Sequence, residues 1–264
     1  MYEWIDPLRF SVCLLFLSAA SISDIKTREV PNFIWLLFAP VGSILTLISL
    51  ALNNWNLSLM TLCGLSIVII VGLSFTLFYL GLFGGADAKA LICLAFSMPV
   101  YPNLEVIGLP LKSYSLKFLI LPPLSTFNNA VLMASLLIFI ITLKNLVDLI
   151  KNGMKIFEGL EREKITTKIL AFITGFRVEA CKIRTKKHHY IILEEFNREE
   201  DGSIRRNLKI FQRIKDEKGE NIPEEINGKI WVTIGLPFLV FITIGFTLAI
   251  LMGDLIFWLL NTII

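Results

Sequence analysis

The sequence has 264 residues, of which 55% are hydrophobic and 18% are charged, with a formal net charge of +3. Soluble globular proteins rarely have so apolar a composition, so it favours a membrane protein that crosses the bilayer several times. Basic and acidic residues are mixed rather than separated into blocks, which argues against a nucleic-acid-binding protein.

The placement of charge divides the chain into regions. No charged residue occurs between Glu29 and Asp87, whereas residues 150–229 hold 18 of the 25 basic and 14 of the 22 acidic residues. We therefore expect a membrane domain at residues 1–150, a soluble cytoplasmic segment at 151–229, and a last membrane helix within 230–264.

Apolar runs approaching the roughly 20 residues that a bilayer requires predict six membrane helices. They cover residues 8–25, 32–52, 57–82, 86–100, 129–149 and 230–260, with the fourth one short. The first run follows acidic residues, so we expect a retained helix and not a cleaved signal peptide. The proline-rich stretch 101–127 is expected to lie on the membrane surface or to re-enter it. These features predict an all-α polytopic membrane protein with a small α+β segment between helices five and six.

The soluble segment has patterns of its own. Apolar spacing predicts a helix over residues 156–173, and strand-like runs follow at 176–183, 189–196 and 204–214. Asp201-Gly202 lies between the last two runs and is typical of a hairpin turn. A small antiparallel sheet is expected.

Basic residues predict the orientation, since they gather in cytoplasmic loops. The segment 151–229 and the first loop, with Lys26 and Arg28, are assigned to the cytoplasm. Both chain termini then lie outside the cytoplasm. The second loop carries no charge, in agreement with this alternation.

Two isolated acids flank a pair of predicted helices. Asp24 ends the first helix and Asp87 begins the fourth, and the hairpin between them returns the chain to the face of the membrane that it left. Acids at membrane depth are costly and are often functional. Simpler roles remain open, because Asp24 can cap a helix or pair with Lys26 or Arg28, and Asp87 suits a helix N-terminus.

The residues around both acids resemble a known family. Asp24-Ile-Lys-Thr-Arg28-Glu29-Val-Pro31-Asn32 resembles the first-aspartate motif of type IV prepilin peptidases. Gly84-Gly85-Ala86-Asp87 resembles the GxGD motif of these membrane aspartyl proteases, followed by a matching Lys89, although Ala86 replaces a glycine. The resemblance is to the archaeal preflagellin peptidases in particular, because a soluble segment precedes the last helix and the paired C-x-x-C insert of bacterial relatives is absent.

The resemblance implies an endopeptidase of the cell membrane that removes a short basic leader from preflagellins and type IV pilin-like precursors at the cytoplasmic boundary. Asp24 and Asp87 would be the catalytic pair, and the other motif residues would support them. Glu29 is a possible contact for the basic leader, although a solvated loop acid is the simpler interpretation. Lys89 can pair with Asp87 or extend toward the interface. Precursor proteins and the lipid bilayer are the expected partners.

No cofactor or metal is expected. The cysteines form no C-x-x-C pair, and adjacent His188 and His189 in a predicted strand would point to opposite faces. Two other functions stay open. One is an intramembrane protease like presenilin or signal peptide peptidase, and the other is an ion-coupled transporter that uses both aspartates.

Overall fold

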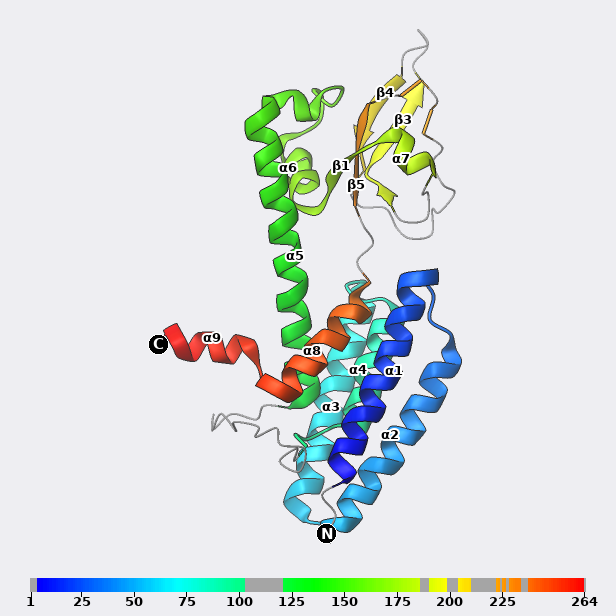
Figure 1. The fold of residues 1–264 in the computed structure, drawn as a ribbon, viewed down its shortest axis with the longest axis vertical. Helices are drawn as coiled ribbons and strands as arrows, with labels where there is room; N and C mark the ends of the chain where they lie inside the picture. Colours follow the sequence, from blue (N-terminus) through cyan, green and yellow to red (C-terminus); the bar gives the residue numbers. More distant parts are fainter. Residues whose placement is uncertain are drawn as a thin grey trace. The chain divides into compact units, whose positions relative to one another are not determined.

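The computed structural model describes residues 4–102, 121–185, 190–198, 204–209, 222–223, 225–226, 228–233 and 237–263. The chain divides into two compact units (Figure 1). The first unit comprises residues 1–134 and 237–264, and the second comprises residues 135–236. The long helix α5, Pro122–Asn152, contributes to both units.

The first unit is helical. Its elements are α1 (Ile5–Thr27), α2 (Asn32–Leu52), α3 (Leu57–Tyr79), α4 (Gly85–Ser97), the start of α5, α8 (Phe238–Met252) and α9 (Leu255–Ile263). The predicted bounds of α2 are confirmed at both ends. Asn56 begins α3 by accepting hydrogen bonds from the N–H groups of Ser58 and Leu59, at 2.9 and 3.3 Å. The polar break predicted between α2 and α3 is therefore a capping site.

Among the residues that the structure describes, four helices, α1, α2, α3 and α5, are long and apolar enough to cross a membrane, and α8 with α9 forms a pair bent by 54° that passes the same test together. The protein is thus a membrane protein, with four to five candidate spans in the described part of the chain, and the prediction of six is not confirmed. The 13 residues of α4 extend over only about 20 Å, less than the roughly 30 Å of a bilayer core.

Two predicted helix starts are wrong. Residues Lys229–Thr233 form strand β5 rather than the start of the last helix, which begins at Phe238 after Pro237. Strand β5 is buried along Ile230–Val232, and the sequence of a buried strand has the same continuous apolar run as the start of a membrane helix. Helix α5 begins at Pro122, seven residues earlier than expected, while residues 103–120 of the proline-rich stretch lie outside the described part of the chain.

Helix α4 forms the centre of the first unit. It packs against α2 and α3 and also contacts α1 and α8. Most of its side chains are buried, including Leu91 and Leu94. Gly42 of α2 lies directly against Ser97, where a Cβ would overlap the serine hydroxyl. Small residues thus let α2 approach the end of α4 closely.

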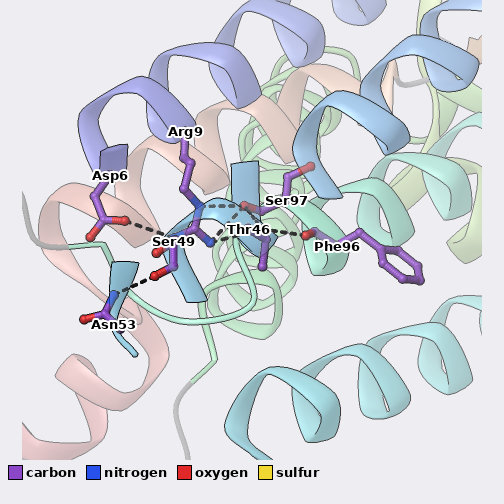
Figure 2. Close-up of polar contacts among 7 residues, drawn as sticks. All are labelled: Asp6, Arg9, Thr46, Ser49, Asn53, Phe96 and Ser97. Carbon is purple, nitrogen blue, oxygen red and sulfur yellow. Dashed lines mark hydrogen bonds and ion pairs between the residues drawn. The ribbon is translucent and has the colours of Figure 1, made fainter. Parts of the chain in front are cut away.

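A buried arginine closes the C-terminal end of α4. Arg9 of α1 is only 3% exposed. Its Nε and Nη2 donate to the carbonyl of Ser97 at 3.2 and 3.0 Å, and its Nη1 pairs with the Asp6 carboxylate at 2.9 Å (Figure 2). The guanidinium also lies 3.4 Å from the hydroxyl of Ser49 and 3.3 Å from that of Thr46. The positive charge of Arg9 therefore lies at the C-terminal end of α4, which is the negative end of that helix's dipole.

The hydroxyl of Thr46 contacts the same C-terminal end of α4. It lies within hydrogen-bond reach of the carbonyls of Phe96 and Ser97, at 2.8 and 3.0 Å (Figure 2). The last carbonyls of a helix have no partner inside that helix, and unsatisfied backbone groups are costly in an apolar medium. Arg9 and Thr46 together allow α4 to end inside the helical bundle.

The second unit contains the end of α5, a 3-10 turn η2 (Gly153–Phe157), α6 (Ile165–Thr174), β1 (Phe176–Glu179), α7 (Ala180–Thr185), β2 (Ile191–Ile192), β3 (Glu194–Arg198), β4 (Ile204–Leu208) and β5. Antiparallel pairing gives a three-stranded sheet in the order β1-β5-β2 and a two-stranded β3-β4 ladder. The predicted small sheet is confirmed. The turn at Asp201-Gly202 lies outside the described residues.

Two expectations for the second unit are wrong. The helix predicted over residues 156–173 begins only at Ile165, and a 3-10 turn and loop precede it. The strand predicted over 176–183 ends at Glu179, where α7 begins. Ile156 and Phe157 of η2 and Leu160 of the following loop are buried in the core of the second unit. Their spacing in the sequence resembles that of one face of a helix.

A buried ion pair lies in the second unit beside Trp231. The side chain of Glu194 is fully buried and accepts two bonds from Arg206, at 2.7 and 2.9 Å. The same carboxylate accepts the backbone N–H of Trp231 at 2.7 Å. The Trp231 ring stacks on Phe157 at 5.2 Å between centroids. The ion pair therefore ties the β3-β4 ladder to strand β5.

Candidate active site

Asp24 lies in the last turn of α1 and is partly buried. The helix ends because Arg28 adopts a left-handed conformation, with φ of 59°. The Arg28 N–H donates to the Asp24 carbonyl at 3.0 Å. The pairing of the Asp24 carboxylate with Lys26 or Arg28 stays a prediction.

The loop after Asp24 is held by hydroxyl groups. Ser23 and Thr27 both donate to the carbonyl of Glu29, at 2.9 and 2.8 Å. The side chain of Glu29 is exposed, so its carboxylate faces the surroundings. Pro31 is the N-cap residue of α2 and is also exposed. The loop therefore has a fixed backbone and an accessible acid.

Asp87 lies in the first turn of α4 and is partly buried. Its Oδ2 accepts the N–H of Gly84 at 3.1 Å. A Cβ on Gly84 would lie 3.1 Å from that same oxygen, which is a crowded contact. The φ of Gly84 is −71°, so glycine serves here to leave space and is not required by the backbone conformation.

The other two residues of the glycine motif have different surroundings. A Cβ on Gly85 would make only an ordinary contact, 3.8 Å from the ring of Phe78. Ala86, the departure from the family pattern, is partly buried and packs against the apolar core. Its methyl group fits this site, so the structure accommodates alanine at the third position of the motif.

Asp24 and Asp87 lie at the same end of the first unit. Helices α1 and α4 are in contact (Figure 1), and Arg9 of α1 bonds to Ser97 of α4. Measured along the helices from that bond, Asp24 lies about 22 Å away and Asp87 about 15 Å away. The shared end of these two contacting helices is therefore the candidate site.

A polar contact links α4 to α2 beside this site. The Nζ of Lys89 donates to the Oδ1 of Asn32 at 2.7 Å, and both residues are exposed. Sequence analysis placed both residues in the motifs but did not pair them, because 57 positions separate them. It also missed Arg9, whose partners lie up to 88 positions away. The signal for Arg9 was a single cation inside an apolar helix.

Within the described residues, no group of three or more histidine, cysteine, aspartate or glutamate side chains is arranged to hold a metal ion. Two neighbouring carboxyl groups have a chemistry of their own, because mutual repulsion favours a state in which one is protonated and the other ionised. Such a pair can donate and accept a proton in the same step.

Comparison with known proteins agrees with this arrangement. The model of the type IV leader peptidase family matches residues 11–143, which include both aspartates. A second model, the archaeal peptidase A24 C-terminus type II, matches residues 167–255.

Several curated relatives extend over nearly the whole chain. A preflagellin peptidase of Methanococcus voltae is 28% identical over 254 residues, covering 94% of this chain and 96% of the relative. One of Methanococcus maripaludis is 25% identical, with the same coverage, and one of Methanocaldococcus jannaschii is 26% identical, covering 94% of each chain. Since the first family model matches half of the chain and contains both motifs, the chain belongs to the type IV leader peptidase family.

Proposed function

We propose that this protein is an aspartic endopeptidase that removes the leader peptide from preflagellins and similar pilin-like precursors. Membership of the leader peptidase family and the names of the relatives support the substrate class. The observation that supports the chemistry is the position of Asp24 and Asp87 at the same end of the helical unit, on helices α1 and α4 that are in contact.

In the proposed mechanism the two carboxyl groups share one proton. The ionised group takes a proton from a water molecule, which attacks the scissile carbonyl carbon. The protonated group donates a hydrogen bond to the carbonyl oxygen and stabilises the negative charge that develops there. A proton then passes to the leaving amine and the C–N bond breaks. The two roles belong to the pair as a whole, because coupled acids titrate together.

The proposed orientation places Asp24, Asp87 and residues 151–229 on the cytoplasmic side and both termini on the other side. Lys26 and Arg28 support it, because basic loops remain in the cytoplasm. A precursor with a basic leader before an apolar helix would present its cleavage site at this membrane boundary. Glu29, exposed in the loop after Asp24, is the proposed contact for the leader's positive charge.

Cleavage of a tagged preflagellin by membranes that contain the protein tests the proposal. We expect Asp24→Asn and Asp87→Asn each to abolish cleavage while the protein remains in the membrane at normal levels. Asp148→Asn, an acid on α5, is the matched control and should cleave like the wild type. Normal cleavage by either active-site variant would refute the catalytic pair.

The position of the cut separates the proposal from its alternatives. Mass spectrometry of the product should locate cleavage at the junction between the basic leader and the apolar segment. A cut inside the apolar segment would indicate a presenilin-like intramembrane protease. Aspartate-dependent ion flux into proteoliposomes without any cleavage would indicate a transporter.

A further inference from the structure

Exposed apolar side chains in the second unit gather at one place. Outside α5, its described residues include six large hydrophobic side chains that are exposed, and five of them lie on η2 and α6: Met154, Ile165, Ile169, Leu170 and Ile173. Ile165, Ile169 and Ile173 follow each other at four-residue intervals, so they form one stripe along α6. Ile165 is 75% exposed and Ile169 is 51% exposed.

Another side of α6 packs against the interior of the second unit. Ala171 is fully buried, and Phe172 packs against the cluster that contains Trp231. Lys168 lies over the ring of Phe157 at 5.9 Å and donates to the carbonyl of Glu161. The helix is therefore amphipathic with a fixed rotation, and its isoleucine stripe faces outward.

Helix α6 is bonded to a helix that has a large exposed apolar surface. Only 11% of the most apolar stretch of α5 is buried, and large apolar side chains are exposed along it from Leu136 to Ile150. Asn145 of α5 donates to the carbonyls of Phe172 and Gly175 at 2.7 and 2.6 Å, which fixes the C-terminal end of α6 beside α5 (Figure 1). Exposed apolar side chains thus lie next to this junction on both helices.

The charges around the stripe suit an anionic surface. Lys151, Lys155 and Lys164 are exposed at the end of α5, on η2 and just before α6. Two nearby acids are engaged within the unit, because Glu161 accepts the N–H of Gly159 and Glu163 accepts the N–H of Leu208. Lysines beside an apolar helical face are the pattern of helices that lie in a lipid interface.

We propose that α6 is a lipid-binding helix, whose stripe of Ile165, Ile169 and Ile173 inserts among the phospholipids of an anionic bilayer next to α5. The second unit is then held on the membrane through α6 in addition to its covalent links to α5 and α8. This inference does not depend on the proposed peptidase function, because it concerns a surface outside the aspartate site.

Collision accessibility of spin labels tests the proposal. Labels at Ile169→Cys and Ile173→Cys, in a Cys181→Ser background that removes the exposed native cysteine, are measured in proteoliposomes of phosphatidylcholine and phosphatidylglycerol in equal parts. Oxygen concentrates in lipid and a nickel chelate in water, so collisions with oxygen should dominate at both positions. Asn197→Cys on β3, an exposed polar site of the same unit, is the control and should show the reverse order.

The outcomes distinguish the possible occupants of the stripe. Dominant nickel collisions at Ile169 and Ile173, as at Asn197, would overturn the proposal. Spectral broadening that disappears when labelled protein is diluted with unlabelled protein would show a second copy on this face, and would also overturn it. A fall in the oxygen-to-nickel ratio in phosphatidylcholine alone would support the role of the lysines, whereas an unchanged ratio would refute that part.

Discussion

Replacing Arg9 tests whether the buried guanidinium stabilises the helical unit by closing α4. Removal of one partner from a fully buried ion pair costs about 3 to 5 kcal/mol. The side chain of Asp6 is 20% exposed, and Thr46 still reaches the Ser97 carbonyl after the change. We therefore expect Arg9→Met to lower the free energy of unfolding by about 3 kcal/mol, at the lower end of that range.

The conservative variant and a double variant sharpen this prediction. Arg9→Lys keeps the charge beside Asp6 but loses the planar pair of donors to Ser97, so the loss should be about 1 kcal/mol. Thr46→Val alone should also cost about 1 kcal/mol. Arg9→Met leaves the hydroxyl of Thr46 as a donor to the end of α4, and Thr46→Val leaves the guanidinium of Arg9. The double variant Arg9→Met/Thr46→Val leaves neither donor, so its loss of unfolding free energy should exceed the sum of the two single losses by about 1 kcal/mol.

Steric trapping of the reversibly unfolding protein in lipid–detergent bicelles measures these unfolding free energies. The order Arg9→Met, Arg9→Lys, wild type in rising stability is the expected result. A loss of under about 1 kcal/mol for Arg9→Met would equal a single ordinary hydrogen bond, and it would refute the idea that this cluster supports α4. Strict additivity of the double variant would refute the shared role of Arg9 and Thr46.

Three further predictions concern packing and buried polar groups. Gly42→Ala places a methyl group on Ser97 and should destabilise the first unit in the same bicelles by about 1 to 3 kcal/mol, whereas Gly64→Ala, with open space around it, should be neutral or stabilising. Glu194→Ala leaves its arginine partner uncompensated and should cost about 3 to 5 kcal/mol, seen as lost hydrogen-exchange protection in β3 and β4; retained protection would contradict it. Asn145→Leu removes two donors from the end of α6, and faster exchange confined to α6 is expected, with unchanged exchange as the opposing result.

Much of the helical architecture is predictable from sequence because its limits are chemically marked. Pro31 and the polar residues after Leu52 define α2 at both ends. Strand β5 is different, because a strand buried between neighbours has the same apolar run as the start of a membrane helix. Only its pairing with β1 and β2, which lie far away in the sequence, distinguishes the two.

The candidate site likewise has residues that the sequence predicts and contacts that it does not. Asp24 and Asp87 are recognisable because each stands alone beside long uncharged runs and within a family motif. The bond between Lys89 and Asn32 and the cluster around Arg9 depend on which helix faces join across the bundle. Sequence spacing within one helix carries no information about such contacts, so local patterns cannot predict them.

The first unit is discontinuous, and this has a consequence for biosynthesis. Helix α8 packs along α1, where the hydroxyls of Ser21 and Thr243 lie 2.7 Å apart. The ribosome makes about 200 residues between these two helices, including the whole second unit, which takes roughly 10 to 40 s. During that interval the face of α1 that packs against α8 lacks this partner. Folding in the cell therefore requires that this face of α1 be kept from other contacts until α8 has been synthesised.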